Sequence, residues 1–495
     1  MEKPMEAVAD PSKKARIAPV PSAISIEAVK RFLPWLVAVA FFMQALDTTI
    51  LNTAVPAIAK ALGVAPLSMK AVLSSYTLSL AVFIPISGWM ADRFGTRQVF
   101  AWAIGTFTLG SVLCGIANNI HLLVACRVLQ GFGGAMMVPV GRLTLVRTFP
   151  KSELIRAMSF VAIPGLVGPM IGPVAGGFIV GFLDWRMIFF INLPVGLLGL
   201  YLVYRHLPDY RQEKSPPLDL GGLVLFGLGI GLLAYVLEVF GEHTLSTGVL
   251  TSLLLTSVIC LVAYGLRAAR IEFPLLKLKL FGIRTFRASV AGSFFTRLGV
   301  GGIPFLLPVL YQVGLGFTPI QSGLLIMPQA AAAISLKVVL RKILQRFGYR
   351  RVLVFNTVML GVMTLSFATI GAATPVWLIV MQVFIFGVFT SLQYSSMNTL
   401  VYADVTEAQT SGASAITSTV QQMAISFGIA TASLLTAVFV PDRFHTAAPE
   451  MISGIHKALV ILGAWTVLSS LIFRELKKND GNALSLHKAI PHAGS

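Results

Sequence analysis

The chain has 495 residues, of which 56% are hydrophobic and only 12% charged, and its mean hydropathy is +0.82. Soluble domains carry about 25% charged residues, so this composition excludes an ordinary soluble fold and indicates a chain solvated by lipid. The net charge of +18 does not indicate nucleic-acid binding, because Lys and Arg lie in short loops between apolar runs, as topology signals and lipid contacts do.

Residues 1–32 are polar and contain four prolines, which predicts a disordered tail without a cleavable signal. The apolar runs that follow are long enough for helices, which need about 20 residues to cross a bilayer, and no strand-like alternation is present. We therefore expect an all-α membrane protein. Fourteen transmembrane helices are predicted at 33–54, 69–91, 98–117, 121–144, 157–180, 187–205, 219–240, 247–267, 286–310, 320–342, 350–371, 375–401, 409–438 and 455–474.

Loops rich in Lys and Arg alternate with loops that nearly lack them. The positive-inside rule places the basic loops, and with them both termini, on the cytoplasmic side. The loop at 93–97 reads RFGTR and the loop at 346–350 reads RFGYR, an offset of 253 residues that also carries the first span onto the ninth. A chance match of five residues is weak, but the matching span indicates two six-helix halves, 33–205 and 286–474. Residues 206–285 then form an insert of two helices, and 475–495 a second tail.

The first span contains an acid, Asp47, within residues 46–56. We expect Asp47 about 10 Å from the outer end of its helix, at 1.5 Å per residue. Burial disfavours an ionised carboxyl group, which suits Asp47 to binding and releasing a proton. A fixed ion pair without a role in transport is the alternative.

Arg127, within residues 127–135 of the fourth span, is expected at a similar depth. A cation this deep needs a counter-charge or carbonyl groups, and Asp47 is the predicted partner. A pair that opens when Asp47 is protonated would link the proton to a conformational change. A permanent structural pair is the alternative.

Two further segments have unusual glycine patterns. Residues 88–97 join the second and third spans, and Asp92 there is expected to face the start of the third span or a nearby Arg. Residues 168–177 form a small-residue stripe in the fifth span, with two Gly-Pro steps that invite a bend. The stripe predicts a hinge or a tight seam between the halves, and ordinary helix packing is the alternative.

Arg297 lies near the middle of the ninth span, and the 253-residue offset maps it to Gln44, one turn from Asp47. We expect Arg297 to face Asp47 across a central cavity, or else to be buried against carbonyl groups or a local carboxylate. The polar residues expected to contact substrate beside Arg297 are Gln44, Gln312, Gln421 and Gln422.

Four of these segments together resemble signatures of the major facilitator superfamily, in particular its fourteen-span drug:proton antiporter branch: 46–56, 88–97, 127–135 and 168–177. The resemblance covers essentially the whole chain. The resemblance implies a gate formed by Gly88, Asp92, Arg93, Gly95 and Arg97. It also implies an antiporter motif formed by Gly168, Gly172, Pro173, Gly176 and Gly177. The repeated loop has Gln345 where Asp92 would map, so a gate that depends on this acid would be one-sided.

The function expected is proton-coupled export of small amphipathic compounds or drugs across the cytoplasmic (inner) membrane, with Asp47 and Arg127 as the proton-coupling pair. The alternative within transport is a dedicated exporter of an anionic metabolite, suggested by Arg297 and by the scarcity of buried acids. A membrane sensor or a channel fits less well, because neither tail is long enough for an output domain and no pore motif repeats. The chain contains no ATP-binding loop, metal-ligand cluster or nucleophile motif, so we expect a monomeric, non-enzymatic transport unit driven by the proton motive force without a cofactor.

Overall fold

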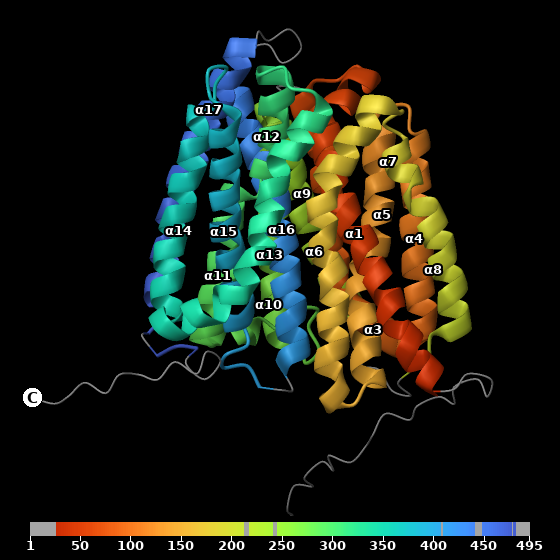
Figure 1. Ribbon diagram of the computed structural model, residues 1–495. Coiled ribbons are helices and arrows are strands. Elements are labelled where there is room, and N and C mark those ends of the chain that lie inside the picture. The colour runs from red at the N-terminus through yellow and green to blue at the C-terminus, as the bar shows by residue number, and fades with distance from the viewer. Residues whose placement is uncertain are drawn as a thin grey trace, which may run out of the picture.

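The computed structural model describes residues 26–211, 217–240, 245–406, 409–440, 448–477 and 479–481, and the regular elements among them are all helices (Figure 1). Thirteen helical segments in the described ranges are long and apolar enough to cross a membrane. A shorter apolar stretch, Val167–Phe182, supplies the fourteenth crossing. The predicted all-α membrane fold is therefore confirmed.

The first six crossings form the amino-terminal half. They are α1 (Ile26–Leu62); η1 (Pro66–Met69), α2 (Lys70–Phe83), η2 (Ile84–Ile86) and α3 (Ser87–Phe94); α4 (Thr96–Ile116); α5 (Ile120–Thr148); α6 (Lys151–Phe182); and α7 (Met187–Phe190) with α8 (Asn192–His206).

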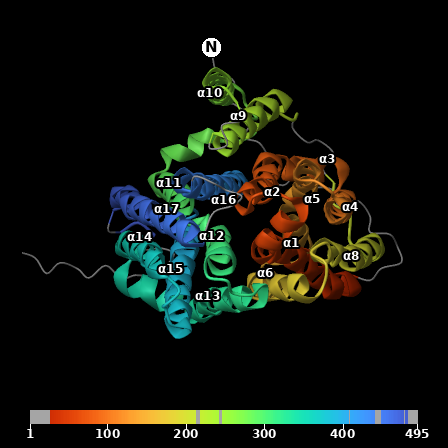
Figure 2. The same cartoon turned by 90° about the horizontal axis from the view of Figure 1, so that it is seen from above.

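The other eight crossings are the inserted pair and the carboxy-terminal half. The pair is α9 (Leu220–Val239) and α10 (Thr247–Arg270), which pack together beside α2 and α16 (Figure 2). The carboxy-terminal half consists of η3 (Leu278–Gly282), α11 (Arg284–Val300), α12 (Ile303–Val309) and η4 (Leu310–Gly314); α13 (Pro319–Phe347); α14 (Tyr349–Ser366) and η5 (Phe367–Thr369); α15 (Val376–Leu400); α16 (Thr410–Phe439); and α17 (Ala448–Ser469) with η7 (Ser470–Glu475).

The two tails agree only in part with their predicted limits. The prediction that residues 26–32 belong to the tail is wrong, because helix α1 already begins at Ile26. The apolar residues before Pro34 extend the first span. Residues 1–25 lie outside the described part. At the other end, Asp480 forms an ion pair with Arg284 at 2.6 Å, which fixes the chain after η7 against the start of α11.

The repeated loop is visible as a repeated backbone conformation. Gly95 follows α3 with φ of 94°, and Gly348 follows α13 with φ of 73°. Both values lie in the region that glycine adopts readily, so each glycine ends one helix and starts the next within a single residue. The shared turn supports the two-half organisation that the 253-residue offset indicates.

The two halves meet at the end of the bundle where α1 ends, called here the far end; the opposite end, where α1 begins, is the terminal end. One hydrophobic core at the far end draws buried residues from both halves, such as Ile50 and Phe305. Toward the terminal end each half has its own core, one around Phe100 and one around Leu353. The halves are therefore joined at the far end.

The small-residue stripe of α6 packs inside its own half. A Cβ at Gly172 would lie 2.2 Å from Thr49 Oγ1 of α1, and a Cβ at Gly176 would lie 2.3 Å from Ile50 O. Gly168 faces α1 in the same way, against Ala45. The expected seam between halves is thus wrong for these three glycines: the stripe lets α1 approach α6 at backbone distance, and α1 lies inside the same half.

The seam between the halves is built one residue further along α6. A Cβ at Gly177 would lie 2.4 Å from Pro319 O of α13, and a Cβ at Gly323 would lie 2.3 Å from Pro173 O. Each helix thus places a glycine against the carbonyl of the other helix's proline. No larger residue fits at either position unless the backbones separate.

We predict that Gly177→Leu opens the far end, because the added side chain collides with the backbone at Pro319. Spin labels at Lys60 and Ala373, both exposed at the far end, should move apart by several Å in a cysteine-free background, since a leucine side chain extends roughly that far. Gly165→Leu is the matched control, because a Cβ at Gly165 of the same helix meets no atom within 4 Å. An unchanged label distance in Gly177→Leu would contradict this account of the seam.

Candidate functional site: a buried ion pair beside a cavity between the halves

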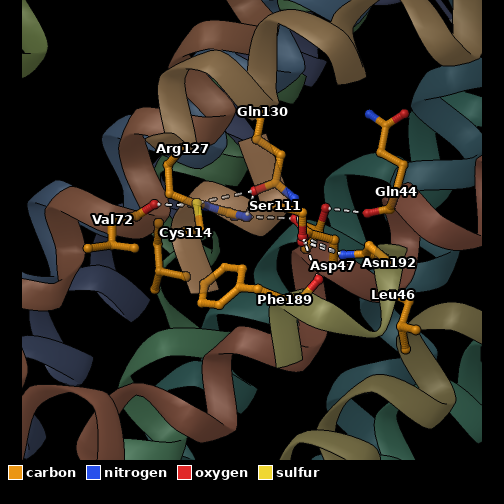
Figure 3. A network of polar contacts seen from close by, with 12 residues as sticks. Gln44, Leu46, Asp47, Val72, Ser111, Cys114, Arg127, Gln130, Phe189 and Asn192 are labelled. Carbon is orange, nitrogen blue, oxygen red and sulfur yellow. Dashed lines mark hydrogen bonds and ion pairs between the residues drawn. The ribbon is translucent and has the colours of Figure 1, made fainter. Parts of the chain in front are cut away.

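Asp47 of α1 and Arg127 of α5 form a buried ion pair inside the amino-terminal half (Figure 3). Arg127 Nη1 donates to Asp47 Oδ2 over 2.7 Å, and each side chain is only 1% exposed. The expected distance of about 10 Å from Asp47 to the outer end of its helix is wrong, because α1 continues through Pro56 to Leu62, 15 residues or about 22 Å beyond Asp47. The expected partnership of the two residues is nevertheless present.

Gln130 holds the two charged groups together. It lies three residues after Arg127, so the two side chains share one face of α5. Its Oε1 accepts from Arg127 Nη1 at 2.7 Å, and its Nε2 donates to Asp47 Oδ1 at 2.8 Å. The Tyr76 ring centroid lies 4.2 Å from the guanidinium carbon of Arg127. Both carboxylate oxygens therefore face donors, which is the arrangement of an ionised acid.

A further set of polar contacts reaches Asp47 from α8 and α4. Asn192 Nδ2 lies 3.4 Å from Asp47 Oδ1 and donates to Ser111 Oγ at 3.0 Å. Ser111 in turn donates to the carbonyl of Phe189 at 2.8 Å, as Figure 3 shows. These contacts fix Asn192 at the start of α8, so its amide is held in place beside the carboxylate.

Sequence reasoning missed Gln130, Ser111 and Asn192 as members of the site. Neutral polar side chains inside an apolar run carry no charge signal, and one of them alone is compatible with ordinary packing. Two features of the sequence could have indicated these residues: the three-residue spacing of Gln130 from Arg127, and the isolated amide of Asn192 within a hydrophobic span.

A cavity of about 190 Å³ lies next to the ion pair, between the two halves. Arg127 reaches its wall, whereas Asp47 lies behind Arg127 and is not part of the lining. The lining residues are Thr48, Thr49, Asn52, Leu73, Tyr76, Thr77 and Arg127 from one half and Arg297, Val300, Gly301, Pro304, Phe305, Gln329, Phe386, Thr390, Tyr394, Ile425 and Ile429 from the other. The wall is thus apolar with hydroxyl and amide groups and two guanidinium groups, and it contains no carboxylate.

Arg297 lies on the opposite wall of this cavity from Arg127, as its predicted place near the middle of the ninth span implies. It is 5% exposed, its Nε donates to Ser293 Oγ at 3.0 Å, and its guanidinium carbon lies 3.6 Å from the Tyr394 ring centroid. Among the described residues, no carboxylate forms an ion pair with Arg297. The structure does not bring Arg297 into contact with Asp47, because Arg127 stands in front of that acid.

The four glutamines expected to contact substrate are not part of the lining of this cavity. Gln312 Nε2 donates to Thr53 O of α1 at 2.9 Å, so Gln312 joins the two halves at the far end. Gln421 donates to Asn398 at 2.7 Å. The lining described above does not include Gln421, Gln422 or Gln44. Gln44 Oε1 is buried without a hydrogen-bond partner among the described residues.

The loop motif at 88–97 forms contacts within one half. Asp92 pairs with Arg147 of α5 at 2.5 Å, and both side chains are about one-fifth exposed. A Cβ at Gly95 would lie 2.3 Å from Asp209 Oδ1, and the same carboxylate accepts from the Arg97 backbone N–H at 3.1 Å. The motif therefore ties α3, α4 and α5 to the chain after α8, and in this structure the Asp92 pair does not bridge the halves.

We predict that Asp47→Asn lowers the free energy of unfolding by about 3–5 kcal/mol, because it leaves Arg127 buried without a counter-charge. The double variant Asp47→Asn with Arg127→Gln should be more stable than Asp47→Asn alone, since both charges are then absent. Thermal unfolding of the purified proteins measures the difference. Independent, additive losses in the double variant would mean that the two groups do not stabilise each other.

Two multidrug resistance proteins are similar to this chain over most of its length. It is 38% identical to the multidrug resistance protein MdtD of Yersinia enterocolitica over 461 residues, which covers 93% of this chain and 98% of that protein. It is 41% identical to the MdtD of an Escherichia coli strain over 409 residues, covering 83% and 87%.

Solved structures share the fold at low sequence identity. A transporter of the POT family, crystallised with 5-aminolevulinic acid, superposes with a TM-score of 0.66 at 15% identity and covers 90% of this chain and 95% of its own. A D-xylose-proton symporter superposes with a TM-score of 0.63 at 14% identity, covering 91% and 99%. Residues 37–474 match the Major Facilitator Superfamily, and the chain, a multi-pass membrane transporter with two six-helix halves and an inserted pair, belongs to that superfamily.

Proposed function

We propose that this transporter exports small amphipathic compounds, drugs among them, from the cytoplasm in exchange for protons. The observation that carries the proposal is the Asp47–Arg127 pair, 2.7 Å long, 1% exposed on each side and in contact with the cavity between the halves through Arg127. The name multidrug resistance protein, carried by relatives 38–41% identical to this chain, supports export of drugs.

The basic loops lie at the terminal end, so we place this end and both termini on the cytoplasmic side of the inner membrane. The far end then faces outward, and the contacts that join the halves there keep the cavity from the outside. Three hydrogen bonds between the halves contribute to this closure, all in the half of the bundle nearer the far end: Gln312 to Thr53 O at 2.9 Å, Ser426 to Ser74 O at 3.1 Å and Ser433 to Leu67 O at 3.0 Å.

Helix α1 connects the proton site to the outer closure. Asp47 and Thr53 are six residues apart on it, about 9 Å along the axis. A proton on Asp47 removes the charge that holds Arg127, so α1 is released from α5 at this point. Because Thr53 of the same helix accepts the contact from Gln312, a shift of α1 is transmitted to the outer closure. For exchange, the protonated carrier without substrate closes the far end again, and release of the proton to the cytoplasm then restores the pair.

We predict that Asp47→Asn abolishes accumulation of substrate in everted vesicles under an imposed proton gradient, because the amide cannot bind and release a proton. Exchange of substrate for substrate across the same membrane should continue, since it needs no net proton movement. The panel should contain cationic, neutral and anionic compounds of similar size.

The matched control is Asp184→Asn, which changes an exposed acid paired with Arg186 at the far end and should accumulate substrate normally. Accumulation at the native rate by the Asp47→Asn protein, at equal amounts in the membrane, would show that Asp47 is not the proton site. Loss of exchange as well as accumulation would indicate damage to the cavity rather than to coupling.

A further inference from the structure

Arg297 stands out in the cavity because its charge is not neutralised. Asp47 balances Arg127 across 2.7 Å, whereas the partners of Arg297 carry no counter-charge: Ser293 Oγ accepts from its Nε, and Tyr394 both stacks on the guanidinium at 3.6 Å and hydrogen-bonds it. A cation–π contact offsets only part of the cost of taking a guanidinium out of water. The cavity therefore has a net positive charge while Asp47 is ionised.

The free part of Arg297 is the part that recognises anions. Its Nε donates to Ser293 Oγ, and the Tyr394 side chain takes a further hydrogen bond, so a guanidinium with five N–H donors keeps N–H groups for a ligand. Two adjacent N–H groups on a planar guanidinium match the two oxygens of a carboxylate and bind it through parallel hydrogen bonds. Because Arg297 reaches the cavity wall, the anion that completes this arrangement is one that enters the cavity.

The rest of the wall limits the size and character of that anion. Phe305, Phe386 and Ile429 give it apolar surface, and Thr48 and Thr390 give it hydroxyl groups. A dry cavity of about 150 Å³ binds benzene, and this cavity measures about 190 Å³. The space is large enough for one aromatic ring with a single acidic group.

We infer that the substrate class of this exporter is small amphipathic carboxylates, with the carboxylate on Arg297 and the apolar part against the aromatic wall. The inference rests on the proposed function for the direction of transport but not for binding. Lipophilic cations are disfavoured in the same cavity, since its wall contains two guanidinium groups and no acid.

The test uses benzoate, benzamide and benzylamine, which share one ring and differ in charge at neutral pH. Equilibrium binding to the purified transporter in lipid nanodiscs should show benzoate at least tenfold tighter than either of the other two. This comparison needs no variant, so it holds even where a substitution disturbs folding. Equal binding of the three compounds, tighter binding of benzylamine, or no saturable binding of benzoate in the millimolar range would each overturn the inference.

Variants then locate the charge responsible. Arg297→Gln should weaken benzoate about tenfold or more and leave benzamide unchanged, while Arg297→Lys should lie between because it keeps the charge and loses the planar pair of donors. Arg287→Gln is the matched control: it removes an Arg of the same helix, paired with Glu475 at the terminal end, and should leave benzoate binding as it is. Unchanged affinity in a folded Arg297→Gln protein would place the anion site elsewhere.

The proposed function and this inference fail separately. Asp47→Asn should keep the preference for benzoate over benzylamine while losing accumulation driven by protons. Proton-driven export of cationic drugs without preference for benzoate would overturn the substrate class alone. Binding of benzoate at Arg297 with no proton-driven transport in the native protein would overturn the proposed coupling alone.

Discussion

The ion pair between Asp47 and Arg127 is the interaction on which the rest of the arrangement depends. Two charges removed from water cost several kcal/mol each, and their mutual attraction compensates only when the geometry is good and the remaining donors and acceptors are satisfied. Gln130 and Asn192 meet this requirement, because their amides bring donors to the second carboxylate oxygen. Such a site is stable while ionised and becomes unbalanced when either partner loses its charge. A proton is the smallest change that does so, which is why a buried pair of this kind suits a switch better than an exposed one.

The glycines of α6 explain why this switch can act through α1. Gly172 and Gly176 bring α1 against the backbone of α6, so α1 is held on one side by backbone packing and on the other by its charge contact with Arg127. Packing of this kind lets a helix slide or pivot with little change in buried area, whereas interlocked large side chains would resist it. The reciprocal contact of Gly177 and Gly323 then places the junction between the halves on the neighbouring turns of α6 and α13.

Most of the fold could be predicted because long apolar runs and basic loops are strong signals. The fourteen crossings follow from them, and so does the pairing of Asp47 with Arg127, since a buried acid and a buried base must find partners. The errors concern properties that depend on neighbours. The length of α1 beyond Pro56 depends on packing that tolerates an interior proline. The face of the glycine stripe depends on which helix lies beside it, and the hydrogen bonds of Gln312 and Gln421 could not be predicted from their positions in a span.

The repeat also shows how the two halves have diverged in charge. The 253-residue offset places Arg297 opposite Gln44 and places Val300 opposite Asp47, so the carboxy-terminal half has a cation but lacks the acid. The amino-terminal half holds a balanced pair set back from the cavity, and the carboxy-terminal half holds an unbalanced charge on the cavity wall. A charge that is neutralised by the protein responds to protons, whereas a charge that is not neutralised attracts a ligand of opposite sign. Two related six-helix units can in this way divide coupling and recognition between them, because each places its charged residue at a different distance from the cavity and from a counter-charge.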